Sequence, residues 1–378
     1  MRKTTAVILT GGWGNSPVEL ALRGGHQAAA RDLLETFASL SRVERVILAA
    51  DDAAWARSLA DLSVTVDVDR ADERFHFGRR LAGVIERCGL ERVLYTGAGS
   101  APLLETDDWA GVLDRLALSD RVVVTNNLHS CDWAAFTCAE EAAGLLASQT
   151  KDNAIGWTLV HEGGFSYHAM EPSAGSRFDI DTPVDLLIAR RHPRVGSHLR
   201  RYLEDLPWGS VRLDGVLAEM RREGGSLMVA GRASPAAWRA LQEATRCWVR
   251  VFAEERGMRA SGRQERGEVR SLLADHLRAV GLETFFETLA ELANGVMLDD
   301  RVILCSLGRW PSALDRFNSD LYRWEEVEDP FLRDFTRAAA QASVPVVLGG
   351  HTVVAGGLMA LAETVSMDRA ARVEGEGA

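Results

Sequence analysis

Lysine is nearly absent from this chain. Only Lys3 and Lys151 occur among 378 residues, and arginine fills the other strongly basic positions. A Walker A loop is therefore excluded, because it needs a lysine directly after its glycines. Schiff-base chemistry has few candidate residues for the same reason. Any phosphate that the protein binds must be met by backbone amides, arginine or a metal ion.

Cysteine pairs and long apolar runs are also missing. The five cysteines are scattered and form no CxxC pair, which argues against a disulfide framework and against a zinc site. The N-terminal MRKTTAVILTGG has a four-residue apolar run before its glycines, too short for the core of a signal peptide. No later stretch approaches the length of a transmembrane span. We expect a cytoplasmic protein without a membrane partner.

The chain as a whole is acidic. Its formal net charge of −11 disfavours nucleic acid as a partner, because affinity for a phosphate backbone needs a dense positive surface. With 378 residues, 47% of them hydrophobic, the chain can bury a sizeable core, and its length favours two domains over one. The composition predicts an ordinary globular protein.

The first half of the chain alternates between strand and helix patterns. AVILT at 6–10 is a strand-like run, a helical pattern covers about 18–40, and VERVILAAD follows as a second strand. The same alternation continues to RVVVTNN. This rhythm predicts an α/β, Rossmann-like fold with a mainly parallel sheet and helices on both faces. Ligands are expected at the carboxyl ends of its strands.

Amphipathic helix patterns dominate from about Pro193 onward. We expect a helix over 234–255, and a buried strand followed by a helix in SVPVVLGGHTVVAGGLMALAETV. The stretch DDRVILCSLGRWPSALDRF at 299–317 offers Asp299, Asp300 and Arg301, which a helix end followed by a strand explains as well. The chain is therefore predicted to hold an α/β domain at 1–194 and a separate, mostly helical domain at 195–378.

The segment RFDIDTPVDLL combines a helix start with two further aspartates. Thr182 fits the N-cap, Pro183 the first helical position and Asp185 the third, which together form a capping box. In an extended segment, Asp179 and Asp181 point to the same side. Two such carboxylates suit a hard cation such as Mg²⁺ with phosphate oxygens as further ligands. A loop pair satisfied by backbone amides is the alternative.

A glycine-rich turn, GGWGN, follows the first strand. Such a turn lets backbone N–H groups approach a phosphate or a base closely. The turn does not match GxGxxG, so a generic tight turn is the alternative interpretation.

Three motifs, in the right order, resemble a nucleotidyltransferase with the GT-A-like nucleotide-binding fold, in the branch of molybdenum-cofactor guanylyltransferase and 2-phospholactate guanylyltransferase. AVILTGG resembles the opening strand and LAGG loop of that branch. YTGAGSAPLL resembles its central strand with a GDxPLL-type motif, and FDIDTPVDLL resembles its DIDTPEDL motif. The resemblance covers roughly 1–194 and leaves the remainder without a family.

This resemblance implies that an acceptor phosphate or phosphonate oxygen attacks the α-phosphate of an NTP and releases pyrophosphate. It implies that Asp179 and Asp181 are catalytic and hold Mg²⁺ or Mn²⁺, and it makes GTP one candidate substrate. The acceptor would be a small phosphorylated metabolite. The residues expected at the nucleotide are Thr10, Gly11, Gly12, Gly14, Asn15, Arg23, Gly99 and Ser100. Those expected at the acceptor, on a strand end and the loop after it, are Asn126, Asn127, His129 and Asp132.

Two departures from the family pattern concern the phosphates. The family's first loop usually supplies an arginine and a lysine, whereas this chain offers only Arg23 after a long gap. Ser100 stands where the family's metal-binding aspartate is usual. A hydroxyl carries no charge to offset a cation, so either the metal site rests on Asp179 and Asp181 alone or the domain binds nucleotide without turnover.

An arginine-rich stretch in the second half, EERGMRASGRQERGEVRS, offers further acceptor contacts. Arg259 and Arg263 could grip an anion with their guanidinium forks. A solvated ion-pair network is the alternative for this stretch. His351 follows two glycines that permit close backbone approach, and a buried structural histidine is the alternative there. For the whole chain, two other functions stay open: a catalytically degenerate nucleotide-binding module, and a GT-A-type glycosyltransferase that uses a nucleotide sugar. The sequence also leaves a homo-oligomer open.

Overall fold

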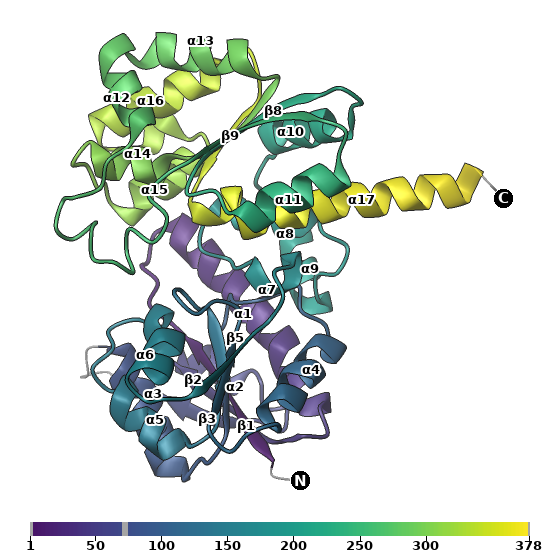
Figure 1. Ribbon diagram of the computed structural model, residues 1–378, viewed down its shortest axis with the longest axis vertical. Coiled ribbons are helices and arrows are strands. Elements are labelled where there is room, and N and C mark those ends of the chain that lie inside the picture. The colour runs from purple at the N-terminus through teal and green to yellow at the C-terminus, as the bar shows by residue number, and fades with distance from the viewer. Residues whose placement is uncertain (1–2, 70–74, 377–378) are drawn as a thin grey trace. The chain divides into compact units, whose positions relative to one another are not determined.

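A computed structural model describes residues 3–69 and 75–376 of the protein, and the chain divides into two compact units (Figure 1). Unit 1 comprises 1–14, 23–176 and 196–202. Unit 2 comprises 15–22, 177–195 and 203–378. The aspartates of RFDIDTPVDLL therefore belong to unit 2, together with the helices of the second half.

The described part of unit 1 contains a seven-stranded sheet in the order β3-β2-β1-β4-β6-β5-β7. β6 runs antiparallel to its neighbours β4 and β5, and the other strand pairs are parallel. This confirms the predicted α/β fold with a mainly parallel sheet. The strands are β1 (Thr4–Thr10), β2 (Val43–Ala50), β3 (Thr65–Val68), β4 (Val93–Gly97), β5 (Val122–Thr125), β6 (Trp133–Phe136) and β7 (Ser166–Ala169).

Alternate residues of β1 face two separate cores. Ala6 and Ile8 join one apolar cluster with Phe37, and Val7 and Leu9 join the other. Helices therefore cover both faces of the sheet, as predicted (Figure 1). The first face packs against α1 (Pro17–Ser39) and α4 (Thr106–Leu116), and the second against α3 (Phe77–Cys88), α5 (Ala139–Leu146) and α6 (Ile155–His161). The remaining short helices are α2 (Ala53–Arg57), η1 (Asp152–Ala154), α7 (Ala174–Arg177) and α9 (Ser197–Glu204).

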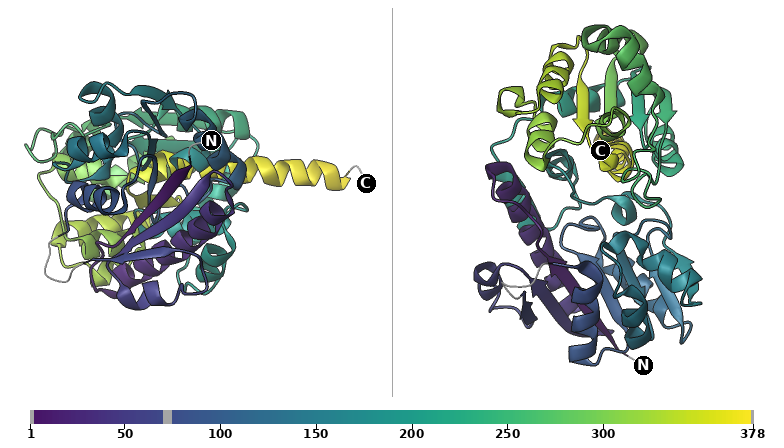
Figure 2. Two further views of the ribbon diagram at one scale, coloured as in Figure 1. Left: turned by 90° about the horizontal axis from the view of Figure 1, so that it is seen from below. Right: turned by 90° about the vertical axis from the view of Figure 1, so that its left-hand side faces the viewer.

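Unit 2 is mostly helical, and its helices surround a four-stranded parallel sheet in the order β11-β10-β8-β9, within the described residues (Figure 2). The strands are β8 (Ser226–Gly231), β9 (Trp248–Ala253), β10 (Gly295–Asp299) and β11 (Val346–Gly349). The helices are α8 (Pro183–Arg191), α10 (Val211–Arg221), α11 (Pro235–Ala244), α12 (Leu272–Val280), α13 (Leu282–Leu292), α14 (Asp300–Ser306), α15 (Ala313–Asp320), η2 (Trp324–Glu326), α16 (Pro330–Gln341), η3 (His351–Val354) and α17 (Gly356–Glu376).

Two element predictions in unit 2 are wrong. The helix expected over 234–255 ends at Ala244, and β9 begins at Trp248, because the residues from there on alternate along an edge strand as WVRVFA. The order expected within 299–317 is wrong, because the apolar run GVMLD forms the buried strand β10, which ends at Asp299, and VILC belongs to helix α14, which follows it. The strand and helix predicted in SVPVVLGGHTVVAGGLMALAETV are confirmed as β11 and α17.

No helix in the described residues combines the length and apolar character that crossing a membrane would require.

Candidate functional site

The predicted nucleotide loop follows β1 at its carboxyl end. Gly11 has φ +139° and Gly12 has φ +85°, a region that side-chain-bearing residues rarely adopt. A Cβ on Gly11 would lie 2.7 Å from Cγ of Asp51. Both glycines are exposed, so their backbone is open to a ligand. Glycine at these positions thus serves both the turn and close approach.

The second predicted nucleotide loop follows β4. A Cβ on Gly99 would lie 2.4 Å from the imidazole of His26, so the loop packs closely on α1. Ser100 is buried, and its backbone N–H donates to the carbonyl of Gly97 at 3.1 Å. The N–H of Ala98 donates to the carbonyl of Leu9 at 3.0 Å, which ties this loop to the end of β1.

These two loops lie at the point where the chain reverses direction across the sheet. From β1 the chain moves to β2 and β3 on one side, and β4 then pairs with β1 on its other side. In open α/β sheets, ligands bind in the crevice at the carboxyl ends of strands at such a point. Unit 1 therefore brings together Gly11 and Gly12 with Gly99 and Ser100 where a ligand is expected.

Arg23, the only arginine expected near the triphosphate, already has acidic partners. Its guanidinium lies 3.3 Å from the carboxylate of Asp51 and 3.7 Å from that of Asp52. The N–H of Trp55, which donates to Asp52, is the largest influence that lowers the pKa of that carboxyl. Of the remaining predicted nucleotide residues, Thr10 and Gly14 lie in unit 1, and Asn15 is exposed and belongs to unit 2.

The predicted acceptor residues lie after β5, and two of them bind one another. The Asn126 amide donates to Oδ2 of Asp132 at 2.6 Å and to the carbonyl of Ser176 at 2.9 Å. Its own Oδ1 accepts from the backbone N–H of Asp132 at 3.2 Å. Asn126 is thus buried and engaged inside the unit, whereas Asn127 is half-buried and His129 is exposed.

The DIDTP segment contains the predicted capping box. The Asp185 carboxylate accepts from the N–H of Thr182 at 2.7 Å, from its hydroxyl at 2.9 Å and from the N–H of Asp181 at 3.0 Å. Burial raises the pKa of Asp185 well above its ordinary value, and the charge of Asp181 adds to the effect. Through these hydrogen bonds, the side chain of Asp185 stabilises the start of α8.

The two candidate metal ligands differ in their surroundings. Asp179 is half-buried, and its Oδ1 accepts a hydrogen bond from the hydroxyl of Thr352 at 3.0 Å. Asp181 is exposed, and in the described part of the chain its carboxylate has no hydrogen bond or ion pair. Ile180 between them is buried, as alternation in an extended segment requires.

This pair fits a Mg²⁺ ion that keeps substrate oxygens and water in its coordination sphere. Mg²⁺ is usually held by one or two carboxylates together with phosphates, and the open carboxylate of Asp181 meets that need. The protein alone does not supply a full set of metal ligands in the described residues, which contain no group of three or more His, Cys, Asp or Glu placed to hold a metal.

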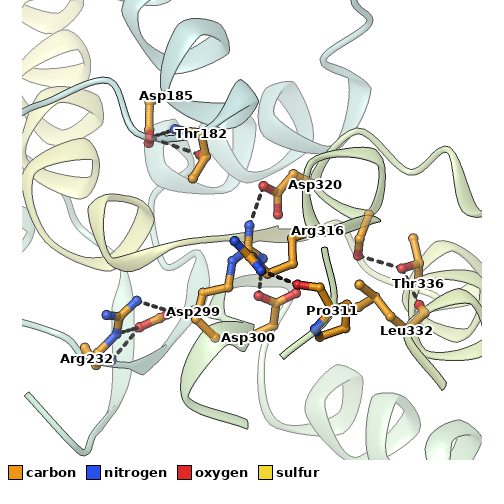
Figure 3. A network of polar contacts seen from close by, with 12 residues as sticks. Thr182, Asp185, Arg232, Asp299, Asp300, Pro311, Arg316, Asp320, Leu332 and Thr336 are labelled. Carbon is orange, nitrogen blue, oxygen red and sulfur yellow. Dashed lines mark hydrogen bonds and ion pairs between the residues drawn. The ribbon is translucent and has the colours of Figure 1, made fainter. Parts of the chain in front are cut away.

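The carboxyl edge of the sheet in unit 2 carries a buried ion pair, and the sequence singled out its aspartate but not its arginine. Arg232 directly follows β8, and Asp299 ends β10. The guanidinium donates to Asp299 at 2.6 Å and 3.0 Å, and the backbone N–H of Arg232 donates at 3.2 Å (Figure 3). Burial acts to raise the pKa of Asp299, but Arg232 outweighs it and the pKa lies below its ordinary value.

A second charge network lies next to this pair. Arg301 is buried, and its guanidinium binds the carboxylates of both Asp300 and Asp320, the latter at 2.6 Å. Oδ2 of Asp300 and Oδ1 of Asp320 are buried without a hydrogen-bond partner. Burial raises the pKa of Asp320 to about 7, although Arg301 acts in the opposite direction.

The pH dependence of stability should report on this network. A carboxyl whose pKa is about 7 in the folded protein and about 4 when unfolded stabilises the fold fully below pH 4 and loses this contribution as the pH rises to 7. In urea unfolding, the free energy of unfolding of the Asp320→Asn variant should therefore fall by a few kcal/mol less than that of the wild type between pH 4.5 and about pH 8. The exposed Asp205→Asn variant should follow the wild type, and parallel curves for all three proteins would contradict the assignment.

Two cavities lie away from the predicted residues. One of about 870 Å³ opens in unit 1 beside Arg92 and Asp120, just before β4 and β5 begin, at the edge opposite the glycine loops. Another, of about 220 Å³, lies in unit 2 between α8, α10 and β11 and includes Asp320 in its wall. Neither contains a residue that was predicted for nucleotide, metal or acceptor.

No protein-family model and no curated protein matches the sequence. Among solved structures, the chain is similar to 4-diphosphocytidyl-2C-methyl-D-erythritol synthase from Anaerococcus prevotii, with a TM-score of 0.37 and 11% identity over 49% of this chain and 93% of that one. It is similar to a cytidylyltransferase from Leptospira borgpetersenii, with a TM-score of 0.36 and 13% identity over 54% of this chain and 93% of that one. The Mycobacterium tuberculosis protein Rv0371c in complex with manganese gives a TM-score of 0.36 and 17% identity, over 54% of this chain and 100% of that one. At these scores the likenesses assign no activity.

Proposed function

We propose that the protein transfers a nucleoside monophosphate group from an NTP to a small phosphorylated acceptor. The observation that carries the proposal is the meeting of the two motif loops, after β1 and after β4, at the reversal point of the unit 1 sheet. Backbone N–H groups of Gly11 and Gly12 are open to the phosphates there, which suits a chain that has almost no lysine.

In the proposed reaction, a phosphate or phosphonate oxygen of the acceptor attacks the α-phosphate of the NTP and pyrophosphate leaves. Asp179 and Asp181 would hold the divalent ion, Mg²⁺ or Mn²⁺, which when bound neutralises charge on the phosphate oxygens. Positioning supplies much of the remaining rate enhancement, because phosphoryl chemistry of this kind needs no covalent nucleophile. GTP is the first nucleotide to test because of the sequence resemblance.

The two proposed acceptor arginines are not equally available. Arg263 donates to Glu255 at 2.9 Å and to the backbone carbonyl of Glu268, so much of its fork is occupied. Arg259 is exposed, its guanidinium lies 5.6 Å from the ring centroid of Trp310, and within the described residues only its Nε donates to a side chain, Oε1 of Gln264 at 3.3 Å. Arg259 is therefore the better candidate for an acceptor contact.

A catalytically degenerate nucleotide-binding module is the second candidate. The buried Ser100, in place of the usual aspartate, favours it, because a hydroxyl brings no negative charge to a metal ion. Under this alternative, nucleotide would bind to unit 1 without turnover.

Pyrophosphate release separates the two candidates. The purified protein is incubated with Mg²⁺, each of the four NTPs and a panel of phosphorylated acceptors, and nucleotide binding is measured in parallel by calorimetry. We expect one NTP to bind and to release pyrophosphate only when an acceptor is present. Binding without turnover across the panel would favour the module, and failure of every NTP to bind would overturn the proposal.

A further inference from the structure

The sheet of unit 2 has its own reversal point. From β8 the chain moves to β9 on one side, and β10 then pairs with β8 on the other side, with β11 beyond it. The carboxyl ends of β8 and β10 are therefore a second place where a ligand of a parallel sheet is expected. At this edge, Arg232 directly follows β8, Asp299 ends β10, and His351 lies just after β11.

The ion pair at this edge leaves no free charge. Arg232 and Asp299 are both buried and neutralise each other through two side-chain hydrogen bonds. Gly231 makes this approach possible, because a Cβ there would lie 2.5 Å from Cβ of Asp299. A ligand at this edge must therefore be recognised by the groups around the pair.

Two of those groups are arginines from the segment after β9. Arg256 is exposed and has neither a hydrogen bond nor an ion pair in the part of the chain that the structure describes. Arg259 is exposed, and Asp181, Arg232 and Asp299 are among the charges that act on it. Asp181 is one acidic side chain that opposes an anion here, whereas Asp299 is already paired.

His351 completes the set at the end of β11. Its side chain is open to solvent but is crowded by protein atoms, and this crowding, with the positive charges of Arg232, Arg256 and Arg177, lowers its pKa to about 4. The imidazole is therefore neutral near pH 7. A neutral imidazole still donates one hydrogen bond and adds no charge to the cluster.

We infer that the carboxyl edge of the unit 2 sheet is an oxyanion-binding site, in which Arg256 and Arg259 provide guanidinium donors and His351 provides an imidazole donor. The ligand class is a phosphate or carboxylate group, which planar guanidinium forks recognise. The further step, that this anion belongs to the acceptor, rests on the proposed nucleotidyl transfer. Binding of the anion itself does not.

The experiment measures anion binding to the full chain without nucleotide and with EDTA, so that neither NTP nor a divalent ion contributes. Inorganic phosphate and malonate serve as separate probes in calorimetric titrations. We expect phosphate or malonate to bind to the wild type, and Arg256→Ala to weaken that binding about tenfold, as expected for loss of a hydrogen bond between charged groups. Arg259→Ala and His351→Phe test the other two donors, with thermal unfolding as a check of the fold.

Arg246→Ala is the matched control, because Arg246 is an exposed arginine of the same unit that has neither an ion pair nor a hydrogen bond from its side chain within the described residues. Equal affinity in wild type and Arg256→Ala, or an equal loss in Arg246→Ala, would overturn the site. If the anion binds but no NTP turns over, the site stands and the proposed function fails. If turnover occurs, Arg256→Ala should raise the KM for the acceptor and leave the KM for the NTP unchanged.

Discussion

The Asp181→Ala variant should lose metal-dependent turnover by about a thousandfold. A metal ion that stabilises charge on reacting phosphates contributes several kcal/mol, and each 1.4 kcal/mol corresponds to a factor of ten in rate. The carboxylate of Asp181 is exposed, and its backbone N–H, which donates to the carboxylate of Asp185, remains in the variant. The fold should therefore keep its stability while the activity disappears.

Pyrophosphate release at several Mg²⁺ concentrations measures this effect, and thermal unfolding shows whether the fold is intact. Asp205→Ala is the control, since Asp205 is an exposed aspartate of the same unit. A variant that turns over normally but melts earlier would show that Asp181 serves the helix start and not the metal. Asp179→Ala is a less clean test, because it also removes the hydrogen bond from Thr352.

The parts of the fold that sequence patterns predicted are those in which local residues decide the structure. Each strand of the unit 1 core is a short apolar run, and the helices between them carry apolar stripes, so the parallel sheet follows from periodicity. The start of α8 follows from Thr182, Pro183 and Asp185 alone, because a capping box involves only neighbours in sequence.

β9, one of the strands that the sequence patterns missed, shows why an edge strand is harder to predict. Only one side of WVRVFA has a neighbouring strand, β8, and most of its side chains are exposed, so its alternation is short and its apolar residues also suit a continuing helix. The wrong order at Asp299 has a different origin, because β10 is a buried central strand, and GVMLD and VILC are both short apolar runs that periodicity alone cannot distinguish.

For the candidate site, the sequence proposes glycines and a pair of aspartates, but it does not give the distant partners of the side chains around them. The sequence placed Asn126 at the acceptor, but its amide is engaged by Asp132 and by the carbonyl of Ser176, and the second partner lies 50 residues away. The pairing of Arg232 with Asp299 joins residues 67 apart and exists only because β8 and β10 are neighbours. Contacts of this range depend on topology, which no local spacing encodes.

Replacing Arg301 with methionine should destabilise the protein by about 3–5 kcal/mol. Removing one partner of a buried ion pair costs this much, because the remaining charge is left without compensation. Here two carboxylates, Asp300 and Asp320, depend on the same guanidinium, and each already has one oxygen without a hydrogen-bond partner. The loss should be larger at pH 8 than at pH 5, since protonation can neutralise carboxyls whose pKa is raised.

Urea unfolding at both pH values measures the effect, with Arg278→Met as the control. Arg278 forms an exposed pair with Asp275 at 2.9 Å, and exposed pairs contribute about 1 kcal/mol or less. The triple variant Asp300→Asn, Arg301→Met and Asp320→Asn should recover most of the lost stability, because it removes the stranded charges together with their partner. A triple variant as unstable as Arg301→Met alone would show that the side chain of Arg301 acts through packing and not through its charge.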